Sequence, residues 1–85
     1  MTETQIGIVV HYFDRLSVAA ISVTEDSLAV GDKIHVRGHT TDLSTIVEAM
    51  QLEHQSVTRA RKGDNVGIRL PGKAHEHDKV FKVTE

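Results

Sequence analysis

The sequence predicts an all-β fold, a small closed antiparallel barrel of six to seven short strands with Greek-key-like connections. Apolar residues recur with a period of two along most of the chain. Gly-Asp and Pro-Gly pairs separate these segments at intervals of roughly 8–14 residues, a spacing typical of small barrels and sandwiches. Closure is expected because a short chain with open sheet edges would invite edge-to-edge pairing.

The first two strands are expected at residues 5–10 and 16–23, where apolar and β-branched residues dominate. Residues 12–15 connect them as a hairpin turn, in which Asp14 is a favourable turn residue. A polar break at residues 24–27 follows this hairpin.

The alternation is clearest at residues 32–38, where Ile34 and Val36 alternate with basic side chains. Two later segments, residues 64–70 and 80–83, repeat the pattern and end or begin at turn residues. Each of these three segments is therefore expected to be a strand with one buried face.

Residues 43–57 allow two interpretations. Their Glu, Ala, Met, Gln and Leu residues favour a helix. Alternatively the stretch is a strand with Val47, Met50 and Leu52 inward, whose parity change at residues 48–49 marks a β-bulge. We favour the bulged strand because every neighbouring segment is a strand.

An 85-residue chain allows one domain, so residues 5–85 are expected to form a single β-barrel after a flexible N-terminal tail at residues 1–4. Its core must be aliphatic, because aromatic residues make up only 4% of the chain and tryptophan is absent. The core residues expected from the alternation are Ile8, Val18, Ile34, Val36, Val47, Met50, Leu52, Val66, Ile68 and Val80.

The composition excludes several classes of function. The chain has no cysteine, which excludes disulfides, thiolate metal ligands and a cysteine nucleophile. A net charge of −2 is a poor basis for bulk attraction to phosphate. The N-terminus has no signal-peptide pattern and no apolar run is long enough to span a membrane, so a cytoplasmic protein without membrane contact is expected.

Three motifs in series resemble the second domain, a β-barrel, of translational GTPases of the elongation factor Tu type and of the selenocysteine-specific factor. They are Val30-Gly-Asp-Lys-Ile-His-Val-Arg-Gly38, Val47-Glu-Ala-Met-Gln-Leu52 and Ala60-Arg-Lys-Gly-Asp-Asn-Val-Gly-Ile-Arg-Leu70. Gly7 and the segment around His11-Tyr-Phe13 resemble a smaller group of stand-alone, elongation factor-like barrels. Similar barrels also occur as C-terminal domains of collagenase-like peptidases. The resemblance implies a translation-factor-like module.

Catalysis and cofactor binding are not expected. The chain has no G-x-x-x-x-G-K-[ST] loop to hold a phosphate, so it is expected to bind neither GTP nor another cofactor. No serine occupies a G-x-S-x-G nucleophile elbow, and the protein is expected not to be an enzyme. Asp32 and Asp64 follow glycines at strand starts, where we expect their side chains to accept hydrogen bonds from nearby backbone N–H groups.

Six histidines are unusual in a chain of this length. On an extended segment His75 and His77 would point to one side with Glu76 opposite, while His35 and His39 flank a turn. Zinc needs three or four ligands, and no pair here has a spacing as diagnostic as H-E-x-x-H. No metal site is assigned, and histidine-based metal binding stays an alternative.

Two basic groups form the expected binding surface, one on the strand at residues 32–38 and one in the loop that precedes Gly63. In elongation factors an acidic residue of the bulged strand helps to hold the terminal adenosine of aminoacyl-tRNA. The resemblance places Gln51 near that position, with an amide in place of the acid. The expected RNA- or partner-binding residues are Lys33, His35, Arg37, His39, Gln51, Arg59, Arg61 and Lys62.

The leading hypothesis is a non-catalytic, translation-factor-like barrel that binds RNA, a ribosome-associated protein or another protein partner, as a monomer or weak homo-oligomer. The second is an accessory subunit or domain partner of a separately encoded enzyme, by analogy with the peptidase-associated barrels. The third is a histidine-based metal-binding protein.

Overall fold

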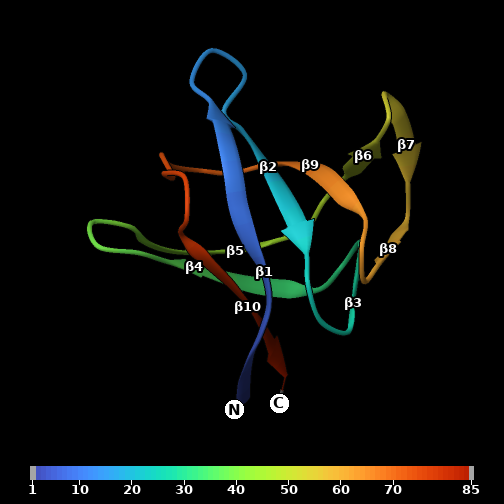
Figure 1. Cartoon of the computed structure of the whole chain (residues 1–85), viewed down its shortest axis with the longest axis horizontal. Coiled ribbons are helices and arrows are strands. Elements are labelled where there is room, and N and C mark those ends of the chain that lie inside the picture. Colours follow the sequence, from blue (N-terminus) through green and yellow to red (C-terminus); the bar gives the residue numbers. More distant parts are fainter. Residues whose placement is uncertain (1, 85) are drawn as a thin grey trace.

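The computed structural model describes residues 2–84, and these residues form ten β-strands and no helix (Figure 1). The all-β antiparallel fold that the sequence predicts is confirmed. Within the described chain there is accordingly no helix that could cross a membrane. The strands are β1 (Thr2–Phe13), β2 (Val18–Val23), β3 (Ser27–Ala29), β4 (Lys33–Arg37), β5 (Asp42–Ile46), β6 (Met50–Leu52), β7 (Gln55–Val57), β8 (Arg59–Arg61), β9 (Asn65–Arg69) and β10 (Lys79–Thr84).

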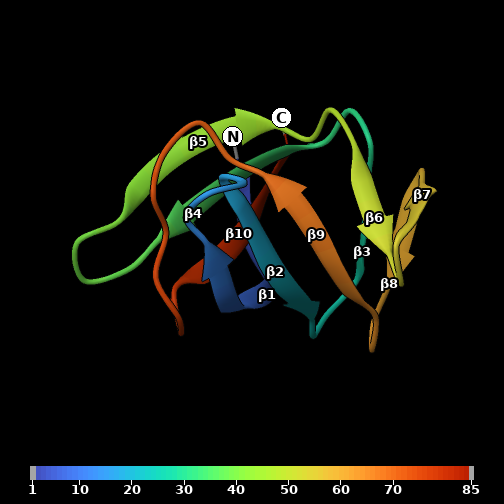
Figure 2. The ribbon, with the colours of Figure 1, turned by 90° about the horizontal axis from the view of Figure 1, so that it is seen from above.

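Eight strands pair in one sheet, in the order β5-β4-β10-β1-β2-β9-β6-β7, and β3 pairs with β8 in a second sheet. Figure 2 shows the large sheet curling, so that β1 and β2 lie across the interior from β5. The order begins at β5 and ends at β7, and these two strands do not pair with each other within residues 2–84. The expected closed barrel of six to seven strands is therefore wrong, because the sheet is curved but open.

The sheet stays open because the chain departs from its neighbour β4 after β5, and β5 does not extend to the opposite edge strand, β7. Val47 still follows that side, since its N–H donates to Asp32 O at 2.9 Å and its carbonyl accepts from Gly31 N at 2.8 Å. Residues 48–49 then carry the chain to β6, which pairs with β9. The parity change predicted there is real, because Val47 and Met50 are both buried. It separates two strands, however, and is not a bulge within one.

The long strand β1 pairs with β10 along its first half and with β2 along its second half. Its register shifts at Ile6 against β10 and at Val10 against β2. Each shift adds one residue, which bends the strand and changes the side that faces the core. Ile6 and Val9 are consequently both buried, whereas Ile8 is half-buried and Val10 is 48% exposed.

The start of β1 differs from the expectation for residues 1–4. Residues 2–4, assigned by the sequence to a flexible tail, belong to β1, where Thr2 pairs with Thr84 and Glu3 with Val83. Met1 lies outside the described residues.

The core is aliphatic, and most of its expected members are buried: Ile34, Val36, Val47, Met50, Val66, Ile68 and Val80. Leu52 is half-buried but packs against this core. Ile8 and Val18 are half-buried and do not pack against it, so their assignment to the core is wrong. Val9 pairs with Ile21, so the bulges in β1 also set which residues of β2 face inward. The inward residues that the sequence analysis missed include Ile6, Val9, Ala19, Ile21, Val23, and Leu28 and Ala60 of the β3–β8 ribbon.

The first bulge can be tested by truncating two neighbouring isoleucines. Ile6→Ala removes a fully buried side chain and is expected to lower the free energy of unfolding by about 3 kcal/mol. Ile8→Ala, the matched control, removes a half-buried side chain and is expected to cost about 1 kcal/mol. Urea unfolding measures both. A larger loss for Ile8→Ala would contradict the register described here.

Candidate functional site

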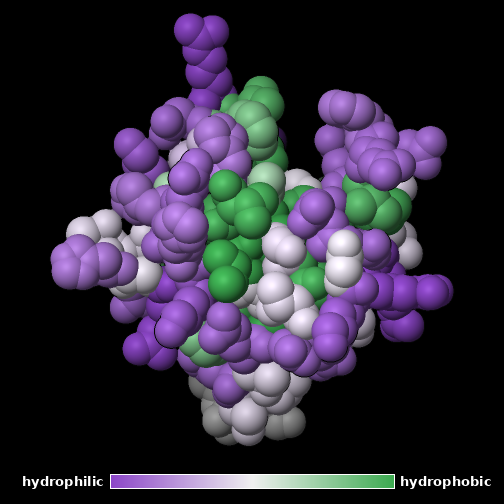
Figure 3. Space-filling view, in the orientation of Figure 1, coloured by the Kyte–Doolittle hydropathy of each residue, from purple (hydrophilic) through white to green (hydrophobic). Residues whose placement is uncertain are grey.

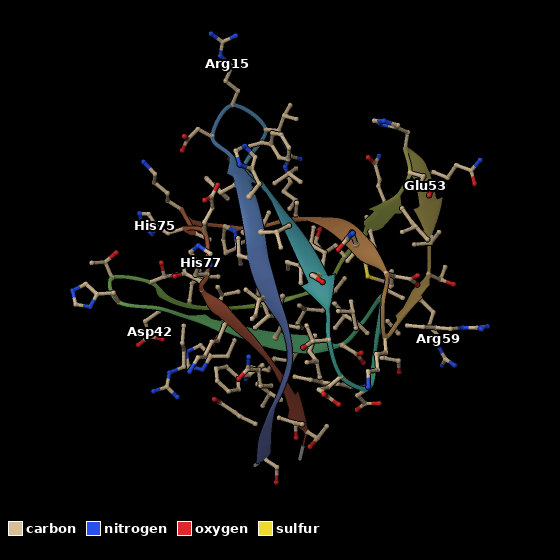
Figure 4. The ribbon with its side chains drawn as sticks, in the orientation of Figure 1. Arg15, Asp42, Glu53, Arg59, His75 and His77 are labelled. Atoms are coloured by element: carbon tan, nitrogen blue, oxygen red, sulfur yellow. The ribbon has the colours of Figure 1, made fainter. Side chains whose placement is uncertain are left out.

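A groove of about 580 Å³ lies where β4 ends and β10 begins. Its walls come from these two strands, from the turn after β4 and from the loop before β10. The lining residues are Arg37, Gly38, His39, Glu76, His77, Asp78, Lys79 and Phe81. Figure 4 shows His77 beside the start of β10, on the same side of the molecule as Asp42.

The loop before β10 ends in a turn that the chain uses three times at the start of a strand. The Asp32 side chain accepts the N–H of Ala29 at 2.8 Å, and the Asp64 side chain accepts that of Arg61 at 2.9 Å. Both bonds confirm the turn role predicted for these aspartates. Asp78 accepts the N–H of His75 at 2.8 Å in the same way.

The third turn differs at the residue that precedes the aspartate. Gly31 and Gly63 have φ values of 98° there, a conformation that glycine adopts without steric cost. His77 occupies the equivalent position with φ 75°, where a side chain is disfavoured. The sequence motif Gly-Asp therefore identifies two of the three turns. The third turn has His-Asp in its place and cannot be recognised from that motif.

The groove floor depends on a close approach between Gly38 and Asp78. The Asp78 side chain is only 6% exposed. A Cβ atom on residue 38 would overlap Oδ1 of Asp78, so only glycine fits against this carboxylate. The backbone of Gly38 also closes the turn after β4, since its N–H donates to Thr41 O at 2.8 Å.

A histidine between two carboxylates joins three strands beside the groove. His35 Nδ1 lies 2.8 Å from Glu3 Oε2, and His35 Nε2 is hydrogen-bonded to Asp42 Oδ1. The hydrogen bond to Asp42, then that to Glu3, raises the pKa of His35 above its usual value near 6.5. The same bond to His35 lowers the pKa of Asp42. The imidazole of His35 thus links β1, β4 and β5.

Arg37 connects this cluster to the groove. Its Nη1 lies 3.8 Å from Glu3 Oε1, and its guanidinium carbon lies 5.8 Å from the centre of the Phe81 ring. Lys79 is the cross-strand partner of Arg37 in the β4–β10 register. Two cations therefore face each other at the mouth of the groove.

The structure separates the residues that the sequence predicts as one binding surface. Lys33, His35 and Arg37 lie on the outer face of β4, because Ile34 and Val36 are buried. His39 joins Arg37 in the groove lining. The other predicted residues lie elsewhere: Gln51 is on β6, Arg59 and Arg61 are on β8 and Lys62 follows β8. Figure 4 places Arg59 at the opposite side of the molecule from Asp42.

The histidines are dispersed and do not form one cluster. His77 lines the groove, whereas His75 and His11 line a smaller hollow. His75 Nδ1 lies 3.1 Å from Thr41 Oγ1. The expected common orientation of His75 and His77 is wrong, because the positive φ of His77 breaks the extended geometry. Among residues 2–84, no group of three or more His, Asp or Glu side chains is placed to hold a metal ion.

Several site residues were missed by the sequence analysis. Glu3 falls within the expected tail, and the sequence analysis assigns no role to Asp42 or Asp78. Lys79 and Phe81 alternate with buried Val80 on the last strand, which is the one pattern that could have placed them on the outer face.

Comparison with known proteins points to peptidases. The chain is 38% identical over 82 residues to a protein of Methanocaldococcus jannaschii named an uncharacterized protease. It is 33% identical over 81 residues to a collagenase of Porphyromonas gingivalis. These matches cover 95% and 94% of the chain but 20% and 22% of the two relatives, so the chain spans about a fifth of their length. No protein-family model matches the chain.

Two solved structures have the same fold. Both contain the C-terminal domain of a Geobacillus thermoleovorans protein described as a U32 peptidase. One has a TM-score of 0.86 at 16% identity and covers 96% of this chain and 93% of that domain. Its selenomethionine variant has a TM-score of 0.84 at 15% identity, covering 91% and 96%. The chain has the fold of a U32 peptidase C-terminal domain.

These findings overturn the resemblance to translation factors. The relatives are named as proteases and collagenases, and the structural neighbours are peptidase domains. The expected partners, RNA or a ribosome-associated protein, are wrong for the same reason. The three motifs behind that resemblance consist of two Gly-Asp turns and alternating strands. Any β fold with such turns shares these features. The second hypothesis, a peptidase-associated domain, is the one that the relatives support.

The contact between Gly38 and Asp78 predicts a strong coupling. Gly38→Ala is expected to lower the free energy of unfolding by about 2 kcal/mol, because the new methyl group overlaps the buried carboxylate. The cost is expected to fall below about 1 kcal/mol in an Asp78→Ala background. Gly72→Ala is the control, since its Cβ would meet only the flexible Leu43 side chain at 3.3 Å. Equal losses in both backgrounds would refute the contact.

The histidine cluster predicts a pH-dependent stability. Because its pKa is raised on folding, His35 contributes fully below its usual value near 6.5, and that contribution is lost as the pH rises through the raised pKa. The Tm of the wild type should exceed that of His35→Gln by more at pH 6 than at pH 9, in calorimetry at constant ionic strength. A difference that does not change with pH would mean that the imidazole is not protonated between the two carboxylates.

Proposed function

We propose that this chain is a non-catalytic accessory module of a U32-type peptidase. In this role it binds a protein or peptide partner, and a separate catalytic domain performs the cleavage. The observation that carries the proposal is the extent of the matches: nearly the whole chain aligns with about a fifth of proteins named as proteases. The matched structures consist of the corresponding kind of domain alone. The remaining four-fifths of such a relative would supply the catalytic residues.

The chemistry of the groove supports binding over catalysis. Its described lining contains no serine, threonine or cysteine that could serve as a nucleophile. Both carboxylates in the lining have partners, since Asp78 accepts the N–H of His75 and Glu76 lies 3.3 Å from His11 Nδ1. The cations Arg37 and Lys79 remain as the groups that face a ligand.

The partner surface of this proposal is the outer face of β4 with the groove. His35, Arg37 and His39 belong to it, together with Lys33 at the far end of β4. Gln51 and the group Arg59, Arg61 and Lys62 lie on other strands and are not part of it. A cytoplasmic location stays a prediction of the sequence.

A domain exchange tests the proposal. The region of the M. jannaschii protease that matches this chain is deleted, and in a second version it is replaced by this chain. Cleavage of fluorescent casein should fall on deletion and be largely restored by the replacement, while the chain alone cleaves nothing. A flexible linker of equal length, inserted at the same place, is the control and should not restore activity. Cleavage by the chain alone, or full activity of the deletion protein, would overturn the proposal.

A further inference from the structure

The groove contains two features that oppose the stability of the fold. The first is the pairing of Lys79 with Arg37, which places like charges directly opposite each other on neighbouring strands. Such pairs are destabilising in antiparallel sheets. Arg37 has a weak partner in Glu3 at 3.8 Å, but Lys79 has no ion-pair partner within the described part of the chain.

The second feature is the backbone at His77. The equivalent position of the other two turns is glycine, and His77 holds a similar positive φ at a steric cost. Residues that retain such a conformation cluster at functional sites. Here the strained residue presents an imidazole to the same groove as Arg37 and Lys79.

Each carboxylate in the groove lining already has a partner. The Asp78 carboxylate is buried and bonded to the backbone of its own turn. The Glu76 carboxylate lines both the groove and the smaller hollow, and its partner is His11 Nδ1 at 3.3 Å. A carboxylate that entered the groove would therefore meet Arg37, Lys79 and imidazole donors first.

Apolar surface borders these cations. Phe81 forms part of the groove wall, and Ile8, the neighbour of Lys79 on β1, is half-buried. Val10, which follows Ile8 along β1, is 48% exposed. Figure 3 shows hydrophobic surface over the middle of β1, between hydrophilic flanks. The combination matches a peptide that carries acidic side chains between apolar ones.

We propose that the groove binds an acidic peptide segment through side-chain carboxylates, held by Arg37, Lys79 and His77. The two cations and the strained histidine then serve to bind the ligand. Its carboxylate offsets the repulsion between Arg37 and Lys79. This inference deepens the proposed function by naming the partner chemistry. It is tested on the chain alone, so its failure leaves the domain exchange informative.

The probe is a blocked hexapeptide in which Glu-Asp is flanked by leucines, titrated into ¹⁵N-labelled protein. The backbone amide signals of Arg37, Gly38, His77 and Lys79 should shift together. Lys79→Gln should raise Kd about fivefold and His77→Gly about threefold. Both variants should also raise the Tm of the free protein by roughly 2–5 °C, because each removes a cost to the fold.

Matched variants outside the groove control for charge and strain. Lys62→Gln removes an exposed lysine and should leave Kd unchanged. His54→Gly relieves a histidine of φ 67° at the β6–β7 turn, so it should raise the Tm without changing Kd. A Kd for the acidic peptide that rises in Lys62→Gln as much as in Lys79→Gln would show general charge attraction and would contradict the proposal.

The remaining arms separate the ligand classes. A blocked Gln-Asn peptide, and the same peptide with a free C-terminus, should each bind at least tenfold more weakly than the Glu-Asp peptide. Equal binding of the free C-terminus would assign the groove to terminal carboxylates and overturn the side-chain proposal. Tighter binding of a short oligonucleotide, or the absence of any shift in these four signals, would overturn it as well.

Discussion

The curvature of β1 is the constraint on which the rest of the structure depends. A single eight-stranded sheet can enclose one core only if it folds back on itself, and the two bulges at Ile6 and Val10 bend the strand in its middle. The bend brings both halves of the sheet over the same aliphatic core. It also directs the first residues of β1 along β10, so that Glu3 reaches His35 on β4. The strand that shapes the core therefore also supports the site.

The sequence predicts well wherever alternation is uninterrupted. Ile34, Val36, Val66 and Ile68 lie in regular strands, and each faces inward as its spacing requires. The alternation misleads at β1, because a bulge changes parity without leaving a sign in the amino-acid types. Because Val9 faces inward, its partner Ile21 in β2 faces inward too, and Val18 lies outside the core.

The site was harder to predict than the fold, because its residues come from distant strands and one of its turns lacks the Gly-Asp motif. His35 was recognised as part of an outward stripe, but its partners Glu3 and Asp42 come from other strands, and their meeting depends on the pairing of β1 with β10. The third Asp turn was hidden because a histidine stands where the other two have glycine. The motifs that were visible, the Gly-Asp turns, describe how strands begin and carry no information about function.

The close packing of Gly38 against Asp78 restricts the order in which this domain can change. A side chain at position 38 is accommodated only after the carboxylate at position 78 has been lost, and loss of that carboxylate alone leaves the N–H of His75 without its partner. A change at either position alone is therefore unfavourable, and a side chain at position 38 avoids its clash only when the carboxylate at position 78 is lost as well. The two positions, forty residues apart, should therefore be inherited as a unit. In a collection of diverged relatives, their joint presence would mark chains that retain this groove more reliably than overall identity does.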